Sequence, residues 1–96
     1  MNKINTKSYL TELKFPIRTN GFIRDALMYH GIIKVKDLCL LTEEEAQKIS
    51  IIKGRNLQAV KLALADLGLW LGMSREELRE YEQSQATPKN YPTPTD

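Results

Sequence analysis

The stretch IKGRNLQAVKLALADLG, residues 52–68, carries the clearest helical pattern in this chain. Its apolar side chains recur at spacings of three and four residues, which places them on one face of an α-helix. Gly54 marks a turn before this helix, and Asn56 is a candidate for its N-terminal cap. Gly68 ends the helix, because glycine readily adopts the left-handed conformation that follows helices. The predicted buried face consists of Leu57, Val60, Leu64 and Leu67, with Ala59 and Ala63 alongside.

In the part of the chain before this helix, the sequence pattern predicts shorter helical elements. Residues 8–15 form a short helix or turn. Thr19 or Asn20 can cap a following helix by accepting a bond from a free backbone amide, and Gly31 ends that helix. A short buried helix is expected at about residues 36–40.

Two capping boxes predict further helix starts. In such a box a hydroxyl and a carboxylate three residues later exchange hydrogen bonds with each other's backbone amides. Thr42 and Glu45 form the first box and open a short helix. Ser74 and Glu77 form the second, which opens a solvated helix that runs to about Gln83.

These elements predict an all-α fold, a compact bundle of four to five short helices, because no segment has the alternation of a β-strand. We expect residues 1–7 to be frayed, residues 8–84 to form one domain and residues 85–96 to be a disordered proline-rich tail. Trp70 is interpreted as a core residue. The predicted core consists of Phe22, Leu27, Ile32, Val35, Leu38, Leu41, Ile49, Leu57, Val60, Leu64 and Leu67.

Composition and cysteine content indicate the class of protein and the cellular compartment that fits it best. The chain has 96 residues, of which 42% are apolar and 27% charged, as expected of one globular domain. No apolar run is long enough to span a bilayer, and no secretory signal pattern is present. The single cysteine, Cys39, lies in an apolar run and is expected to be buried. A reducing compartment, the cytoplasm, fits best.

No combination of residues predicts catalysis. His30 and Cys39 are the single histidine and cysteine, and no third group is placed to orient them. We interpret them as a helix-end histidine and a core cysteine. A four-ligand metal site would need carboxylates, which structural zinc sites rarely use, and Gly54 lacks the spacing of a phosphate-binding loop. We therefore expect no enzyme, cofactor, metal or small-molecule substrate.

The turn that opens the long helix combines three features that suit a phosphate oxygen. Gly54 permits a close backbone approach, the helix N-terminus offers free amides and a positive dipole, and Lys53 and Arg55 flank the turn. A short helix, a glycine turn and a second helix are also how helix-hairpin-helix modules hold a DNA backbone. This segment therefore indicates DNA contact.

Five motifs follow one another as they do in a known family. Residues 31–38 read GI followed by VKDL, which is similar to the family's GI…VGDL, and TEEE at 42–45 is similar to T-E-x-E. The remaining motifs are IKGRNL at 52–57 for LGKKSL, LGLWLGM at 67–73 for GLxLGM and LKFPIRT at 13–19 for LxLxVRS. From about Leu10 to Met73 the chain thus resembles the C-terminal domain of the bacterial RNA polymerase alpha subunit.

The resemblance implies a compact helical domain that binds the DNA minor groove upstream of promoters and touches sigma factor or activators. Arg18 matches the family's DNA-binding arginine, and Arg55 and Asn56 match its hairpin lysine and serine. Lys53 stands at the family's glycine position, with Gly54 displaced by one. Because the chain begins at its own methionine without the long assembly domain, we expect a stand-alone version of the domain.

Two alignments of the first long helix remain open. If Arg18 is the family's arginine, four additional residues, about one helical turn, lie between it and Gly31. Gly21 then replaces a DNA-binding asparagine. If no gap is introduced, Phe22 replaces the arginine and Asp25 the asparagine, and a carboxylate there would oppose DNA.

The first functional hypothesis is a non-enzymatic, transcription-associated DNA-binding domain. It would contact the AT-rich minor groove, where a guanidinium benefits from the enhanced negative potential of a narrow groove. The hairpin turn and the N-terminus of the first long helix would provide the contacts. The candidate DNA-binding residues are Arg18, Arg24, Lys53, Gly54, Arg55 and Asn56.

The second hypothesis is a protein-interaction module that binds RNA polymerase, sigma factor or a transcription regulator without binding DNA. Lys14 stands where the family has an acidic residue that faces sigma factor. An exposed Trp70 would support this hypothesis, because aromatic side chains anchor interfaces. The candidate interaction residues form the acidic helix start Thr42, Glu43, Glu44 and Glu45.

Overall fold

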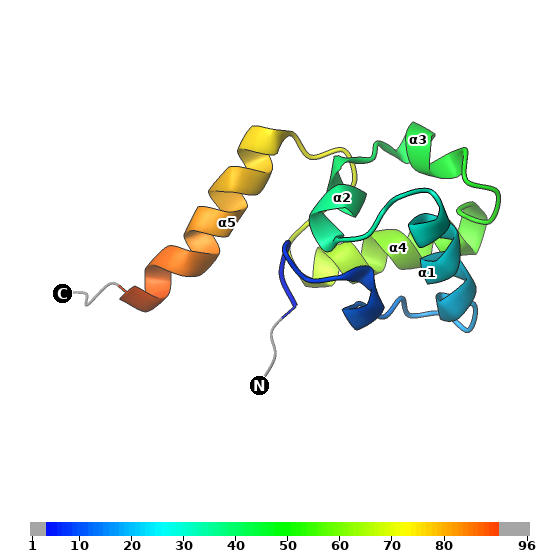
Figure 1. Ribbon diagram of the computed structural model, residues 1–96, viewed down its shortest axis with the longest axis horizontal. Helices are drawn as coiled ribbons and strands as arrows, with labels where there is room; N and C mark the ends of the chain where they lie inside the picture. Colours follow the sequence, from blue (N-terminus) through cyan, green and yellow to red (C-terminus); the bar gives the residue numbers. More distant parts are fainter. Residues whose placement is uncertain (1–3, 91–96) are drawn as a thin grey trace.

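The structure of the chain, a computed structural model, describes residues 4–90, with side-chain environments as far as residue 84. The fold in this range is all-helical, as predicted, and its β pairing is limited to an isolated bridge between Tyr9 and Lys34 (Figure 1). The elements are the 3-10 helix η1 (Leu10–Glu12) and the α-helices α1 (Asn20–Tyr29), α2 (Val35–Leu40), α3 (Glu43–Gln47), α4 (Gly54–Asp66) and α5 (Arg75–Asn90).

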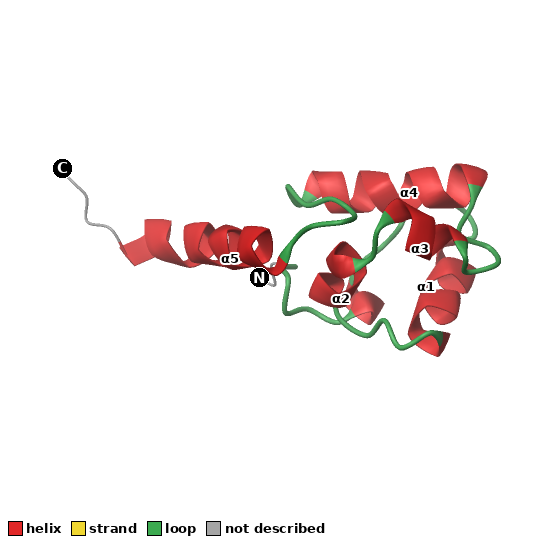
Figure 2. Ribbon diagram, turned by 90° about the horizontal axis from the view of Figure 1, so that it is seen from above, coloured by secondary structure: helices red, strands yellow, loops and turns green. Residues whose placement is uncertain are grey.

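One apolar core joins the N-terminal segment, the helices α1, α2, α3 and α4, and Leu78 of α5, while most of α5 extends away from the other helices (Figures 1 and 2). Most predicted core residues are confirmed as buried. These are Leu27, Val35, Leu38, Ile49, Leu57, Val60 and Leu64, with Ile32, Leu41 and Leu67 half-buried at the edge. The N-terminal segment adds Leu10, Leu13 and Phe15, which the predicted core did not include.

Phe22 is the predicted core residue that the structure places outside the core, with 71% of its surface exposed. The buried side of α1 is centred on Ile23 and Leu27, which are fully buried. Phe22 lies about 100° around the helix axis from Ile23. The prediction was wrong because the apolar residues of α1 spread over a wider arc of the helix than the arc that packs against the core.

Both glycines predicted to end helices do so through the same backbone motif. After α1, the Gly31 amide donates to the Met28 carbonyl and the Ile32 amide to the Leu27 carbonyl, each at 3.0 Å. Gly68 ends α4 with the equivalent pair of bonds. The φ angles of Gly31 and Gly68 are +84° and +81°, in the left-handed region that favours glycine.

Replacing Gly31 by alanine is expected to destabilise the protein by about 1 kcal/mol, because a Cβ is disfavoured at positive φ. No atom lies within 4 Å of that Cβ, so the substitution tests backbone strain without any steric clash. Gly21→Ala inside α1 is the matched control and should stabilise by up to about 1 kcal/mol, because alanine is the better helix former. Urea unfolding measures both changes. Equal effects of the two substitutions would contradict this role of Gly31.

Both predicted capping boxes are present. At the start of α3 the Glu45 amide donates to the Thr42 hydroxyl at 3.1 Å, and the Thr42 amide donates to the Glu45 carboxylate at 3.0 Å. Ser74 and Glu77 make the same exchange at the start of α5, at 3.0 and 2.8 Å. The starts of α3 and α5 are therefore satisfied by their own side chains.

The N-terminal segment is tied to the domain from Ile4 onwards, although residues 1–7 were expected to be frayed. Thr6 is buried, its carbonyl accepts from the Lys36 amide at 3.0 Å, and its hydroxyl donates to the Glu82 carboxylate at 2.7 Å. Backbone bonds to the chain around α2 thus anchor the segment. The expectation was wrong for residues 4–7, and residues 1–3 lie outside the described part.

Helix α5 is longer than the sequence predicted. It continues past Gln83 to Asn90, so its last residues take the place of the first part of the expected disordered tail. Its first half is attached to the domain, because Leu78 is buried and the Tyr81 hydroxyl donates to the Leu67 carbonyl. The rest of the predicted tail, residues 91–96, lies outside the described residues.

The apolar loop after α4 returns to the core only in part. Leu69 and Met73 are buried, whereas Trp70 is 49% exposed, so the interpretation of Trp70 as a core residue was wrong. The amides of Gly72 and Met73 both donate to the Cys39 carbonyl at 2.9 Å. These bonds fix the loop against α2 with its two ends facing inward, and Trp70 remains on the outer side.

Cys39 is fully buried, as predicted. Desolvation raises the pKa of its thiol to about 12, because burial disfavours the charged thiolate. We expect a chromogenic disulfide reagent to leave native Cys39 unmodified at mildly alkaline pH and to modify it fully in guanidinium. A fast, stoichiometric reaction of the folded protein would contradict this burial.

Candidate nucleic-acid interface

A hydrogen bond between two side chains joins the N-terminal ends of α1 and α4. Thr19, the N-cap residue of α1, donates its hydroxyl to Oδ1 of Asn56 in the first turn of α4, at 2.6 Å. The Asn56 amide group donates to the Ile51 carbonyl at 2.8 Å. Both side chains are half-buried, where water competes less for such bonds. The start of α1, the turn before α4 and the start of α4 are thus connected.

This junction brings together the two basic segments predicted to contact DNA. Arg18 directly precedes Thr19, and residues 53–55 directly precede Asn56. Arg18 and residues 53–55 are exposed, so these charges face solvent. The structure therefore places the predicted arginine next to the hairpin turn, although the two are far apart in the sequence.

Arg24 adds a charge to the same helix start from another side. It lies about 140° around the α1 axis from Thr19 and is half-buried. A Cβ built on Gly21 would lie 4.0 Å from the Arg24 Nη2 atom, which shows that the guanidinium folds back towards the first turn. Arg24 therefore contributes to the positive charge at the N-terminus of α1.

Thr19 is the N-cap residue of α1, as predicted, but the side chains predicted to cap the helices at this junction make connections across the fold and no capping bonds. Asn56 is not the N-cap of α4; that residue is Lys53, whose side chain makes no capping bond. The Thr19 hydroxyl does not cap α1 but faces Asn56. Oδ1 of Asn20 accepts from the Phe15 amide at 2.7 Å. Thr19 and Asn20 are thus positioning residues that the candidate site did not include.

Within the described residues, α1 and α4 are the α-helices that carry no acidic side chain in their first turn. The first turns of α2, α3 and α5 do carry acids, for example Asp37, Glu43 and Glu76. Acids at these positions offset the positive end of the helix dipole. Two helix starts without such compensation meet at one place, which favours an anionic ligand there.

Gly54 keeps the backbone of the turn at this junction accessible to a ligand. Its φ of +52° is in the left-handed region, and no atom lies within 4 Å of the place where a Cβ would stand. The first amides of a helix have no partner within the helix, so the amides of Gly54 and Arg55 are directed outwards. A phosphate oxygen can therefore approach the backbone at this turn.

The acidic helix start Thr42–Glu45 is exposed but largely engaged in local contacts. Thr42 and Glu45 form the capping box, and Glu43 makes an ion pair with Lys61 of α4 at 2.8 Å. Glu44 is exposed and takes part in neither contact. Local structure thus accounts for most of this cluster, which leaves Glu44 as its freest carboxylate.

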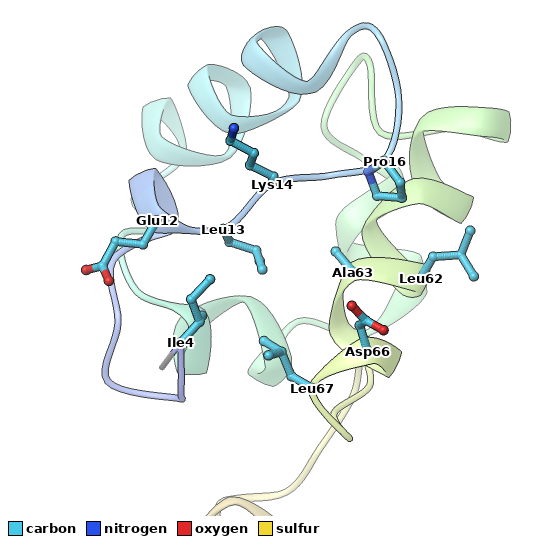
Figure 3. A pocket seen from close by; sticks show the side chains of 9 residues that line it. All are labelled: Ile4, Glu12, Leu13, Lys14, Pro16, Leu62, Ala63, Asp66 and Leu67. Atoms are coloured by element: carbon cyan, nitrogen blue, oxygen red, sulfur yellow. The ribbon is translucent and has the colours of Figure 1, made fainter. Parts of the chain in front are cut away.

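A mostly apolar hollow of about 520 Å³ lies between the N-terminal segment and the second half of α4 (Figure 3). Leu62, at its rim, is 60% exposed, and Asp66 lies beside it on α4. The hollow is lined by Ile4, Glu12, Leu13, Lys14, Pro16, Leu62, Ala63, Asp66 and Leu67. Since it borders the far half of α4, it is separate from the junction at the start of that helix.

The described residues contain no group of three or more His, Cys, Asp or Glu placed to hold a metal ion. Between residues 4 and 90, no helix has both the length and the apolar character needed to cross a bilayer. Neither the protein-family models nor the curated proteins searched gave a match to this chain.

Because Thr19 and Asn56 share one hydrogen bond, we expect the two substitutions together to lower the free energy of unfolding by less than the sum of their separate effects. Asn56→Ala should cost about 1–3 kcal/mol, because it leaves the Ile51 carbonyl without its partner. Thr19→Val should cost about 1 kcal/mol alone and nearly nothing in the Asn56→Ala background, since the shared bond is already absent there. Urea unfolding of the four proteins measures this coupling. Full additivity of the two costs would contradict the bond.

Proposed function

We propose that the protein is a non-enzymatic DNA-binding domain and that the junction of α1 and α4 is its interface, called here the paired-helix interface. The interface comprises the residues around the bond between Thr19 and Asn56. The observation that supports the proposal is this bond, which joins two basic helix starts that lack acids. Its charged and backbone contacts would be Arg18, Arg24, Lys53, Gly54 and Arg55.

The physical chemistry of these groups suits a phosphate backbone. Two helix starts present amides and positive dipole ends, and exposed Arg18, Lys53 and Arg55 add full charges within the same small area. Neutralising phosphates releases counterions, which is the main source of affinity for DNA in such proteins. Asn56 would act by positioning the turn, because both of its polar side-chain atoms are already engaged.

The target and the setting of the proposal come from the sequence resemblance. The resemblance to the C-terminal domain of the polymerase alpha chain implies the minor groove, and we propose AT-rich DNA and a role in transcription. A guanidinium from Arg18 or Arg55 gains most in the narrow, electronegative groove of AT-rich DNA. The fold proposed with this function is the helical fold of that family.

The experiment is a salt titration of binding to AT-rich and GC-rich duplexes, measured by fluorescence anisotropy. We expect affinity that falls steeply with salt and is higher for the AT-rich duplex. The double variant Lys53→Ala with Arg55→Ala should weaken binding to both duplexes. It should also reduce the salt slope by about 0.9 for each phosphate that is no longer neutralised.

The control for net charge is a second double variant, Lys14→Ala with Arg79→Ala. It removes the same charge from exposed positions outside the paired-helix interface. If both double variants weaken binding equally, net charge and not the interface is responsible. If the wild-type protein binds neither duplex at low salt, the proposed function is wrong.

A protein-interaction function is the second candidate, and the exposure of Trp70 favours it. Partners would be RNA polymerase, sigma factor or a transcription regulator, and Glu44 and the hollow beside Leu62 offer further contacts. Trp70→Ala and Glu44→Lys are expected to reduce capture of such a partner. Unchanged capture by both variants would reject these surfaces.

A further inference from the structure

An exposed aromatic ring stands beside the proposed paired-helix interface. Phe22 lies in the first turn of α1, three residues after Thr19, and is 71% exposed. Its neighbour Ile23 is fully buried, so the core of this part of α1 is complete without Phe22. The contacts that stabilise the fold therefore do not account for a phenylalanine at this position.

The geometry of α1 directs this ring towards the junction. Phe22 lies about 60° around the helix axis from Thr19, whose hydroxyl bonds Asn56 at the start of α4. Side chains of helical residues lean towards the N-terminus of their helix. The ring thus leans towards the N-terminal end of α1, where Arg18 lies and where Thr19 bonds Asn56. Arg24, two residues further on, lies on the opposite side of the helix from Phe22.

The chain offers an internal comparison in Tyr29. Tyr29 lies on the same flank of α1, since seven residues return almost to the same side of a helix, and it is 88% exposed. It stands about 10 Å further along the axis, away from the junction. Tyr29 makes an edge-on contact with the His30 ring at 5.6 Å. Of these two exposed rings on one flank of α1, Phe22 is therefore the one that lies next to the junction.

We propose that Phe22 inserts as an apolar wedge at a flexible pyrimidine–purine base step, such as TA, in the DNA held by the paired-helix interface. The inference rests on the proposed function and adds the class of target to it. Proteins that bind the minor groove insert apolar side chains between base steps that unstack easily, while nearby cations hold the flanking phosphates. TA steps unstack easily, whereas A-tracts of the same base composition are stiff.

The surrounding charges define where the wedge would act. Asp25, exposed one turn further along α1, repels phosphates and so limits the contact to the first turn of the helix. Arg18, Lys53 and Arg55 supply exposed positive charge at the junction, next to the first turn of α1. The phosphates on either side of the opened step are thus attracted to the junction and excluded from the middle of α1.

The test compares two AT-only duplexes, one with alternating TA steps and one with an A-tract, by anisotropy. The wild-type protein is expected to bind the TA-step duplex more tightly and to raise the fluorescence of 2-aminopurine placed at a TA step. Phe22→Ala should weaken binding to the TA-step duplex by about tenfold, a typical effect of removing one aromatic stack. Its salt slope should not change, because the same phosphates remain neutralised.

Control variants separate the wedge from effects of folding and of exposed aromatic rings in general. Tyr29→Ala should leave both affinities unchanged, and Phe22→Trp should retain the preference for TA steps. Phe22→Ala should keep the thermal stability of the wild type, since the ring contributes little to the core. Retained stability shows that a fall in affinity is local.

Two results would overturn the wedge. If Phe22→Ala binds both duplexes as the wild type does, while the double variant of Lys53 and Arg55 weakens binding, the interface stands and the wedge is wrong. If the wild-type protein binds neither duplex, the proposed function fails and the wedge fails with it.

Discussion

The hydrogen bond from Thr19 to Asn56 connects two parts of the chain that are separated by 37 residues, and the proposed interface depends on it. It holds the N-terminal end of α1 against that of α4. Both helices also contribute side chains to one apolar core, and the bond fixes Arg18 next to residues 53–55. Together these residues form one positively charged area with two helix dipoles. Because Asn56 also donates to the Ile51 carbonyl, the same side chain orders the turn that precedes α4.

The distribution of helix caps explains why this area differs from the rest of the surface. The starts of α3 and α5 are closed by capping boxes, and that of α2 by the Asp37 carboxylate, which accepts from the Lys34 amide at 3.1 Å. Such caps satisfy the free amides and offset the dipole. The starts of α1 and α4 have neither cap, and their free amides and basic side chains remain available to an anion.

Local sequence signals predicted those parts of the fold that depend on neighbouring residues. Gly31, Gly68 and the box of Thr42 and Glu45 were predicted correctly, because a helix end is determined within a few residues. The exposure of Phe22 and Trp70 was predicted incorrectly. Periodicity shows that a helix has an apolar side, but packing against distant segments decides where that side is centred and which loop residues it covers.

The candidate site shows the same division. The basic residues and the glycine turn could be recognised in the sequence, since phosphate binding needs these residue types at a helix start. No local signal could have paired Thr19 with Asn56, because their contact arises only when α1 packs beside α4. Sequence reasoning therefore assigned both residues as caps, whereas the structure uses them to position the two helices.

The most direct test of the paired-helix interface is an amide chemical-shift titration of the labelled protein with an AT-rich duplex. We predict that the amides of residues 18–22 and 53–56 shift together, with one common dissociation constant, while those around Trp70 and Glu44 remain unchanged. Shifts confined to the region of Trp70 and Glu44, or different dissociation constants for the two segments, would contradict the claim that α1 and α4 form a single DNA-binding surface.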